Sequence, residues 1–170
     1  YEERKRREDE VLKRFGKDAQ RKGRKAILVA TQVIEQSLDL DFDLMVTELA
    51  PVDLVLQRSG RMHRHDRDDR PSRLKSPRLW IIKPEVSDEG MLDSGVSTYF
   101  YDEYVMFKSW LALKDLRQIS MPNDLEELIE TVYGAGENAG SCEAHVRALK
   151  QAFDQRQLDM SSSAADKVMK

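Results

Sequence analysis

The sequence predicts an α/β fold with a parallel sheet in its first half and a mostly helical region in its second half. Short apolar runs alternate with helix-like segments up to about residue 85, which is typical of strand–helix–strand units. After Gly90 and Gly95, apolar residues recur at helical spacing instead. We therefore expect two regions, residues 1–85 and residues 86–170.

The first region opens with a predicted charged helix over residues 2–22. Its buried side consists of Val11, Leu12 and Phe15, and Gly23 ends it. The run AILVA at residues 26–30 then predicts a strand, because a short unbroken apolar run is typical of strands covered on both faces in a parallel sheet.

Residues 32–38 can form about two helical turns, and residues 44–47 predict a second strand. Pro51 favours the start of a helix that continues into QRSGRMHR. Residues 66–77 are polar and hold two prolines, which indicates a loop. Residues 78–83 (RLWIIK) predict a further strand before Pro84.

The second region is expected to hold three helices, over residues 99–116, 125–133 and about 142–153. Gly134 ends the second of them. The last ten residues, SSSAADKVMK, have little to bury, so we expect them to be frayed or part of a linker.

Composition limits the kind of protein. With 35% charged and 40% hydrophobic residues and a net charge of −3, the chain fits a soluble globular protein and not a generally basic nucleic-acid coat. A single cysteine, Cys142, excludes an internal disulfide and favours a reducing compartment. No apolar run approaches the roughly 20 residues that span a bilayer. The charged start, without Met or a signal-peptide pattern, suggests a piece of a longer protein.

Two arginines carry the most specific chemistry. Arg61 and Arg64 follow Gly60 at a three-residue spacing, so both could reach one phosphate from one helical face. Guanidinium groups are planar, permanently ionised donors that match phosphate oxygens. Gly60 would let the backbone approach closely, and Arg58 could tie the helix to neighbouring acidic groups. Taken alone, the arginine-rich run is explained more simply as a solvated, charge-rich turn.

The order of two segments changes that balance. VATQVIEQSLDLDFD followed by QRSGRMHRH resembles motifs V and VI of superfamily 2 helicases, in the form found in the CRISPR-associated helicase–nuclease of type I systems. YDEYVMFKSWLAL and ISMPNDLEELIETVY also look like that family's segment after the motor lobe. The resemblance implies that residues 1–85 form the C-terminal part of the second RecA-like (P-loop NTPase-like) lobe, and residues 86–170 a helical linker or C-terminal region.

The resemblance also implies a role for each matching residue. Arg61 and Arg64 would be arginine fingers on the γ-phosphate of ATP. Thr31 would contact the nucleic-acid backbone, with Gln32 and Glu35 beside it. Four further positions would lie on the nucleotide side: Asp39 near the ribose, Gln57 at the first position of motif VI, and Arg58 and Gly60 as supporting contacts. Ser37 stands where many related helicases carry glycine, although the family it resembles most also uses serine.

The implied function is that of an ATP-dependent single-stranded-DNA translocase or helicase of CRISPR interference in the prokaryotic cytoplasm, which unwinds target DNA and helps degrade it. The sequence holds no G-x-x-x-x-G-K-[ST] phosphate loop, so ATP and Mg²⁺ would be bound mainly by the first RecA-like lobe. This chain alone is therefore expected to be inactive. The implied partners are that lobe, single-stranded DNA, a guide-RNA surveillance complex and a fused or separate histidine–aspartate nuclease domain.

Other interpretations stay open on the sequence. Another superfamily 2 DNA or RNA helicase would share motifs V and VI but not the details QSLDLDFD and RMHRH, and a non-catalytic nucleic-acid-binding module could keep the fold. Thr31 could simply end a strand. The alternating aspartates at 39, 41 and 43 could form a divalent-metal loop, but the glycine turn and closing glutamate are missing. His63 and His65 lack zinc spacing, so no metal ligand is expected. Trp80, Trp110 and the tyrosines from Tyr99 to Tyr104 could stack bases but are more typical of a core.

Overall fold

The computed structural model describes residues 2–19, 25–35, 38–88, 92–93, 99–134 and 143–168. The chain divides into two compact units. Unit 1 consists of Tyr1–Glu48 and Asp53–Ile82, and unit 2 consists of Leu49–Val52 and Lys83–Lys170. Within the described residues, no helix is both long and apolar enough to cross a membrane.

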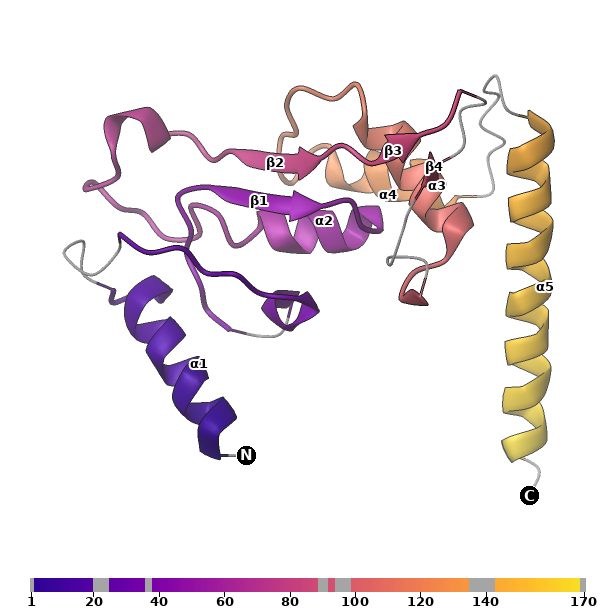
Figure 1. The fold of residues 1–170 in the computed structure, drawn as a ribbon, viewed down its shortest axis with the longest axis horizontal. Helices are drawn as coiled ribbons and strands as arrows, with labels where there is room; N and C mark the ends of the chain where they lie inside the picture. Colours follow the sequence, from indigo (N-terminus) through magenta and orange to yellow (C-terminus); the bar gives the residue numbers. More distant parts are fainter. Residues whose placement is uncertain are drawn as a thin grey trace. The chain divides into compact units, whose positions relative to one another are not determined.

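Unit 1 is built around a β1–α2–β2 arrangement (Figure 1). The strands β1 (Met45–Glu48) and β2 (Leu79–Ile82) pair in parallel, with Met45 opposite Leu79 and Glu48 opposite Ile82. Helix α2 (Val52–Ser59) connects them, followed by a loop with the short 3₁₀ helix η3 (Ser72–Leu74). The α/β class and the parallel sheet are thus confirmed, and the two predicted strands lie within one residue of their expected positions.

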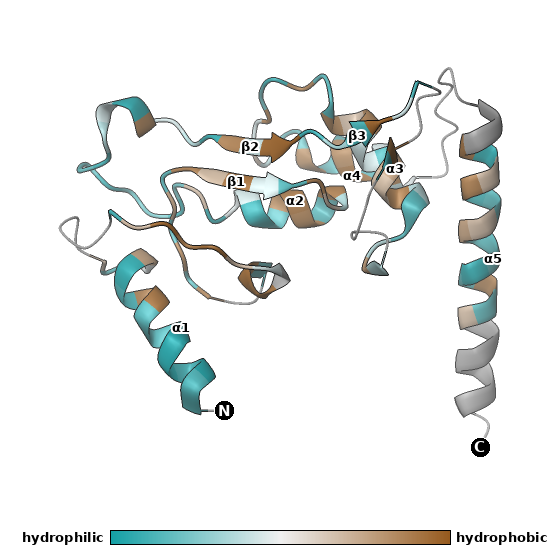
Figure 2. Ribbon diagram, viewed as in Figure 1, coloured by the Kyte–Doolittle hydropathy of each residue, from teal (hydrophilic) through white to brown (hydrophobic). Residues whose placement is uncertain are grey.

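The core of unit 1 forms where α1 (Glu2–Phe15) meets the segment before β1. Phe15 packs against Phe42 with ring centroids 5.2 Å apart, and Leu40 completes the buried cluster. Val11 and Leu12 pack on this cluster, so the predicted buried stripe of the helix is confirmed. The rest of α1 is polar, as its mostly hydrophilic colouring in Figure 2 shows.

Helix α1 ends at Phe15, seven residues before the predicted end at residue 22. The carbonyl of Phe15 accepts a hydrogen bond from Asp41 N (2.8 Å), which diverts the chain from the helix. The next residue is Gly16, and glycine is needed there because a Cβ would lie 2.5 Å from the carbonyl oxygen of Leu12. The predicted stop, Gly23, lies outside the described residues.

Residues 26–30 are not a strand, so that prediction was wrong. Ala26 and Leu28 pack on the Phe15 cluster, whereas Ile27 and Val29 are 93% and 91% exposed. A strand needs a hydrogen-bonding neighbour, and none of the described strands pairs with this segment. After it, the expected helix over 32–38 is a 3₁₀ helix, η2 (Gln32–Glu35), and residues 36–37 lie outside the description.

Unit 2 is mostly helical. It contains a short antiparallel pair, β3 (Glu85–Val86) and β4 (Leu92–Asp93), and the helices α3 (Glu103–Leu113), α4 (Leu125–Tyr133) and α5 (Glu143–Val168). Helix α3 contacts both other helices. The predicted helical second region is confirmed, and α4 has its predicted bounds.

The ends of the other two helices differ from the prediction. Helix α3 starts at Glu103 because Asp102 caps it, its carboxylate accepting from Tyr104 N at 2.9 Å. Helix α5 continues to Val168, so the expected frayed tail was wrong for residues 161–168. Pairs one turn apart support α5, such as Lys150 with Asp154 at 3.0 Å. Contacts with α3 add to them, including Tyr104 with Phe153 at a ring distance of 5.5 Å.

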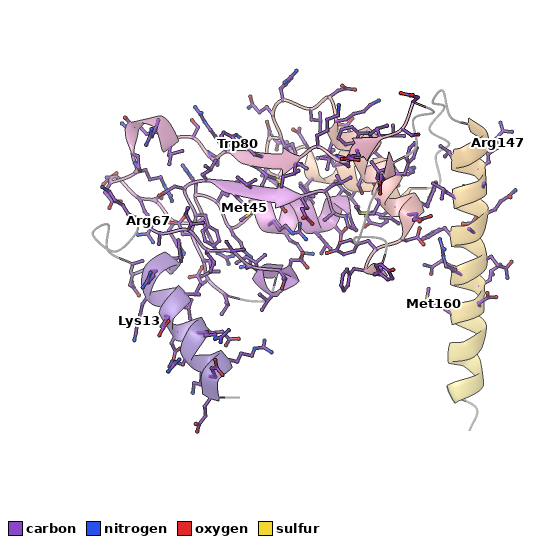
Figure 3. The ribbon with its side chains drawn as sticks, viewed as in Figure 1. Lys13, Met45, Arg67, Trp80, Arg147 and Met160 are labelled. Carbon is purple, nitrogen blue, oxygen red and sulfur yellow. The ribbon has the colours of Figure 1, made fainter. Side chains whose placement is uncertain are left out.

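Two aromatic residues expected in a core are instead exposed. Trp80 on β2, labelled in Figure 3, and Tyr99 both lie largely open, whereas Tyr104 is buried as expected. Trp80 lies opposite Val46 in the β1–β2 register, and both face outward, so one face of the two-stranded sheet is partly apolar.

A buried hydroxyl in unit 2 leads to a first prediction. Ser109 is fully buried, and its Oγ accepts a hydrogen bond from the backbone N of Val52 at 3.0 Å. Replacing Ser109 with Ala would leave that buried N–H without its acceptor, at a cost of about 1–3 kcal/mol. Thermal or urea unfolding should therefore show a lower stability for Ser109→Ala. The control Ser72→Ala, at an exposed position, should show no measurable change in stability. A Ser109→Ala variant as stable as the wild type would contradict the prediction.

Candidate nucleotide and nucleic-acid site

The candidate site lies in unit 1, where two chain segments meet. The acidic segment is residues 38–43 (LDLDFD), and the arginine loop is residues 60–70 (GRMHRHDRDDR). Their backbones are joined directly: Phe42 N donates to the carbonyl of Arg61 at 2.8 Å, and His63 N donates to the carbonyl of Phe42 at 3.1 Å. Residues of the two predicted motifs are therefore brought side by side.

Arg58 ties helix α2 to the residues before the acidic segment. Its guanidinium is buried and binds Glu35 through two donors, with Nε and Nη2 at 3.0 and 2.5 Å from Oε1. Its Nη1 also donates to Thr47 Oγ1 at 2.7 Å. The expectation that Arg58 links the helix to an acidic group is confirmed, and Glu35 is thereby held in place by the α2 helix.

Arg61 points into unit 1. It is only 7% exposed, and its two terminal nitrogens donate to backbone carbonyls, Nη1 to Leu38 and Nη2 to Glu35 (3.1 Å). Burial, together with the nearby charge of Arg64, lowers the pKa of Arg61 from its ordinary value. In this structure Arg61 therefore holds the chain leading into the acidic segment.

Arg64 points outward. Its side chain is 46% exposed and its Nε lies 2.9 Å from Asp39 Oδ1, whose side chain is 48% exposed. His65 Nε2 contacts the same oxygen at 3.0 Å. An ion pair with this much exposure contributes at most about 1 kcal/mol, so a phosphate group could replace Asp39 as the partner of Arg64 at little cost. Two residues predicted to face the nucleotide, Arg64 and Asp39, thus lie together at an open surface.

Three of the remaining predicted residues are exposed. Thr31 is exposed in the bend before η2, and the side chain of Gln32 lies outside the described part. Gln57 is exposed on α2, and Gly60 is exposed in the turn that follows. Among the described residues, a Cβ on Gly60 would meet nothing closer than Gln57 O at 3.5 Å, so packing against them does not require glycine there.

Sequence reasoning missed three residues at the centre of the site: Asp41, Arg67 and Arg70. The carboxylate of Asp41 has no exposed surface and accepts from Arg67 Nε and from Arg70 Nη2, the latter at 2.8 and 2.9 Å. Burial alone would raise the pKa of Asp41, but the hydrogen bonds and charges of Arg70 and Arg67 hold it below its ordinary value. The interpretation of this run as a solvated turn is therefore wrong for Arg67 and Arg70.

A signal for these residues was present in the sequence. Arginines recur every third residue from 61 to 70, and aspartates alternate from 39 to 43. In the structure, Asp39 pairs with Arg64, Asp41 with Arg67 and Arg70, and Asp43 with Arg70 at 2.6 Å. The three aspartates thus bind guanidinium groups. Among the described residues, no group of three His, Cys, Asp or Glu could hold a metal ion.

Comparisons with known proteins identify the family. A family model described as "CRISPR-associated nuclease/helicase Cas3, C-terminal" matches residues 1–67. The chain is 50% identical over 143 residues to the CRISPR-associated endonuclease/helicase Cas3 of Thermus thermophilus, and 38% identical over 133 residues to that of Streptococcus thermophilus. The chain belongs to the Cas3 family. It spans 15% and 14% of the length of these two relatives, which cover 82% and 78% of this chain.

Solved structures agree with this assignment to the Cas3 family. One named as a CRISPR-associated protein matches with a TM-score of 0.86 at 49% identity, over 96% of this chain and 18% of that chain. Cas3 of T. fusca with ADP matches with a TM-score of 0.73 at 33% identity, over 94% of this chain and 18% of that chain. A pre-nicking CRISPR RNA-guided surveillance complex matches at 32% identity and a TM-score of 0.72, over 94% of this chain and 20% of that chain. The resemblance seen in the sequence is confirmed, as is an α/β lobe followed by helices.

The opposite orientations of Arg61 and Arg64 predict different effects on stability. Arg61→Ala removes two charge-assisted hydrogen bonds from part-buried carbonyls and should lower the free energy of unfolding by roughly 2–4 kcal/mol. Arg64→Ala breaks only an exposed pair and should cost less than about 1 kcal/mol. Urea unfolding of the two variants measures both values, and equal losses would contradict the orientations described here.

His63 predicts a pH dependence of stability. It has a left-handed backbone (φ 49°), and its buried Nε2 has no hydrogen-bond partner among the residues that the structure describes. Burial first, and then the charge of Arg70, lowers the pKa of His63 from 6.5, against opposing effects of Asp43 and Asp41. The unfolded chain therefore takes up a proton more readily than the folded one. Stability contributed by neutral His63 is present above pH 6.5 and is lost as the pH falls below it.

The free energy of unfolding, measured with urea between about pH 7 and pH 5, tests this pH dependence. This range lies above the pH at which most carboxylates titrate. His63→Asn should flatten the decline in stability toward low pH, since asparagine does not titrate and tolerates the left-handed backbone. The control His65→Asn leaves His63 in place and should keep the decline. An unchanged slope in His63→Asn would show that another group is responsible.

Proposed function

We propose that this chain is the part of a Cas3 helicase motor that joins a nucleotide contact to a DNA contact. The full protein would be an ATP-dependent translocase on single-stranded DNA that unwinds target DNA and helps degrade it. The names of the relatives, nuclease/helicase, support an enzyme of this class. Solved T. fusca Cas3 chains that resemble this one carry ADP, AMPPNP or ATP in their names, which supports a nucleotide as the energy source.

One observation carries the proposal: the predicted DNA-side and nucleotide-side residues share hydrogen bonds. Glu35, on the DNA side, accepts from Arg58 through its carboxylate and from Arg61 through its carbonyl, and Arg61 also binds the carbonyl of Leu38. Any movement of the arginine loop toward a phosphate must therefore move or strain the segment that follows Thr31. Such a direct link is what a motor needs to convert hydrolysis into movement on a strand.

On the nucleotide side, Arg64 supplies the charge. In the transition state of phosphoryl transfer, negative charge is spread over the terminal phosphoryl oxygens, and a guanidinium group stabilises it. Arg64 would exchange Asp39 for these oxygens, and the released carboxylate of Asp39 could then accept a hydrogen bond from a ribose hydroxyl. Arg61 is the second member of the proposed pair, and its part requires its present carbonyl acceptors to be replaced by phosphate oxygens.

On the DNA side, Thr31 offers an exposed hydroxyl just before η2. The hydroxyl can donate to a phosphate oxygen of the DNA backbone, a contact that is independent of base sequence. Gln32 belongs to the same proposed contact. Glu35, held by Arg58, acts as the connection between this contact and helix α2.

The other components of the motor would lie outside this chain. ATP with Mg²⁺ would be bound mainly by the first RecA-like lobe, against which Arg64, Gln57 and Gly60 would face. A guide-RNA surveillance complex would deliver the DNA, a partner supported by the structural match to such a complex. A histidine–aspartate nuclease domain would degrade the strand. The proposed location is the prokaryotic cytoplasm, and residues 1–85 and 86–170 are the proposed domains.

Substitution of Arg64 in the full-length protein tests the proposal. Arg64→Ala should lower kcat for DNA-stimulated ATP hydrolysis by about 10³-fold, the lower end of values for arginine fingers, and change KM for ATP by only a few-fold. Arg73→Ala, at an exposed position in η3, is the matched control and should keep wild-type turnover. Wild-type turnover in Arg64→Ala would refute the assignment. Turnover by the purified chain alone would also contradict it, since this chain supplies one wall of the cleft.

A further inference from the structure

The backbone around Arg64 is held from both sides by one buried ion cluster. Asp41 Oδ1 accepts a hydrogen bond from the backbone N of Arg64 at 3.1 Å. Arg70, which binds both oxygens of Asp41, also donates from Nη2 to the carbonyl of His65 at 2.9 Å. The N–H of Arg64 and the carbonyl of the next residue are thus fixed by two side chains that bind each other, while the Arg64 side chain stays open.

The same cluster is anchored to the rest of unit 1. Arg67, labelled in Figure 3, binds Asp41 and donates to the carbonyls of Gly16, Lys17 and Ala19, just after α1, at 2.7, 2.9 and 3.0 Å. Arg70 also binds Asp43 through Nη1 at 2.6 Å. The cluster therefore connects the end of α1, the acidic segment and the arginine loop.

Burial makes this arrangement stiff. A charged carboxylate without access to water is stable only while its cationic partners keep good geometry, because an unpaired buried charge is very costly. The Asp41 carboxylate has no exposed surface, and Arg70 is also buried. An exposed guanidinium on a flexible loop would reach a phosphate in many orientations, whereas one on a fixed backbone reaches it in few.

We infer that Asp41, Arg67 and Arg70 are positioning residues for the proposed hydrolysis: they set the backbone of Arg64 so that its guanidinium meets the terminal phosphate, and they do not touch the nucleotide. This inference rests on the proposed function of Arg64. None of these three residues belongs to the site predicted from the sequence, and their positioning role acts only through Arg64.

The test uses Arg70→Lys in the full-length protein. Lysine keeps the positive charge, but its single nitrogen cannot span Asp41, Asp43 and the His65 carbonyl in the geometry of a planar guanidinium. We expect kcat for DNA-stimulated ATP hydrolysis to fall about tenfold, with KM for ATP changed by less than about twofold. Arg73→Lys, the same exchange at an exposed position a few residues further along the chain, should leave both constants unchanged.

A double variant separates positioning from general damage to the fold. If Arg70 acts through Arg64, adding Arg70→Lys to Arg64→Ala should lower the residual rate by less than about twofold. A further tenfold loss in the double variant, or wild-type kcat in Arg70→Lys, would overturn the inference. Retention of turnover in Arg64→Ala alone would instead overturn the proposed function, so the two failures can be told apart.

A milder variant covers the case in which Arg70→Lys does not fold. Asp43→Asn removes the charge of one partly exposed acceptor of Arg70 and leaves Asp41 in place. It should lower kcat about threefold in the wild-type background and have no effect in the Arg64→Ala background. An equal effect in both backgrounds, or no effect in either, would contradict the positioning role.

Discussion

A carboxylate without access to water sets the organisation of unit 1. Asp41 is fully buried, and its charge is compensated by Arg67 and Arg70, which lie more than twenty-five residues further along the chain. Because a buried charge cannot be left unpaired at tolerable cost, the chain must return to this point after β1 and α2. The acidic segment and the arginine loop are therefore adjacent in the folded protein, with the Arg67 guanidinium closing the end of α1 onto both of them.

The arginines in and around the loop divide into two kinds by their surroundings. Arg58, Arg61, Arg67 and Arg70 direct their guanidinium groups inward, toward carboxylates and backbone carbonyls. Arg64 alone among the arginines of the arginine loop lies nearly half open, next to an equally open aspartate. A guanidinium that faces solvent on a backbone fixed by its neighbours is well suited to an incoming phosphate, because little reorganisation is needed on binding. This contrast favours Arg64 over Arg61 as the first proposed nucleotide contact, and it gives Arg58, Arg67 and Arg70 a supporting part.

The membership of the Cas3 family and the local geometry support each other. The family links this chain to nuclease/helicases, and the structure shows how predicted DNA and nucleotide residues are joined within a single unit. Thr31 and Arg64 are separated by 33 positions, yet Glu35, Arg58 and the backbone of Arg61 connect their segments through a few hydrogen bonds. The proposed coupling between the two contacts would run through these hydrogen bonds.

The sequence by itself determined the fold class with a parallel sheet, strands close to residues 45–48 and 79–82, the helix over 125–133 and the family, since these depend on local periodicity and on residue order. It did not determine which arginines are buried, because all of them are chemically identical before folding, and burial depends on partners distant in the chain. The sequence also predicted a strand at residues 26–30, and the structure has none there. The prediction failed because strand formation depends on hydrogen-bonding neighbours and not on apolar content alone. The orientation of Arg61, the exposure of Arg64 and the charge cluster at Asp41 were decided only by the tertiary structure. There, the free energy of burying a charge selects one set of pairings among several that the sequence allows.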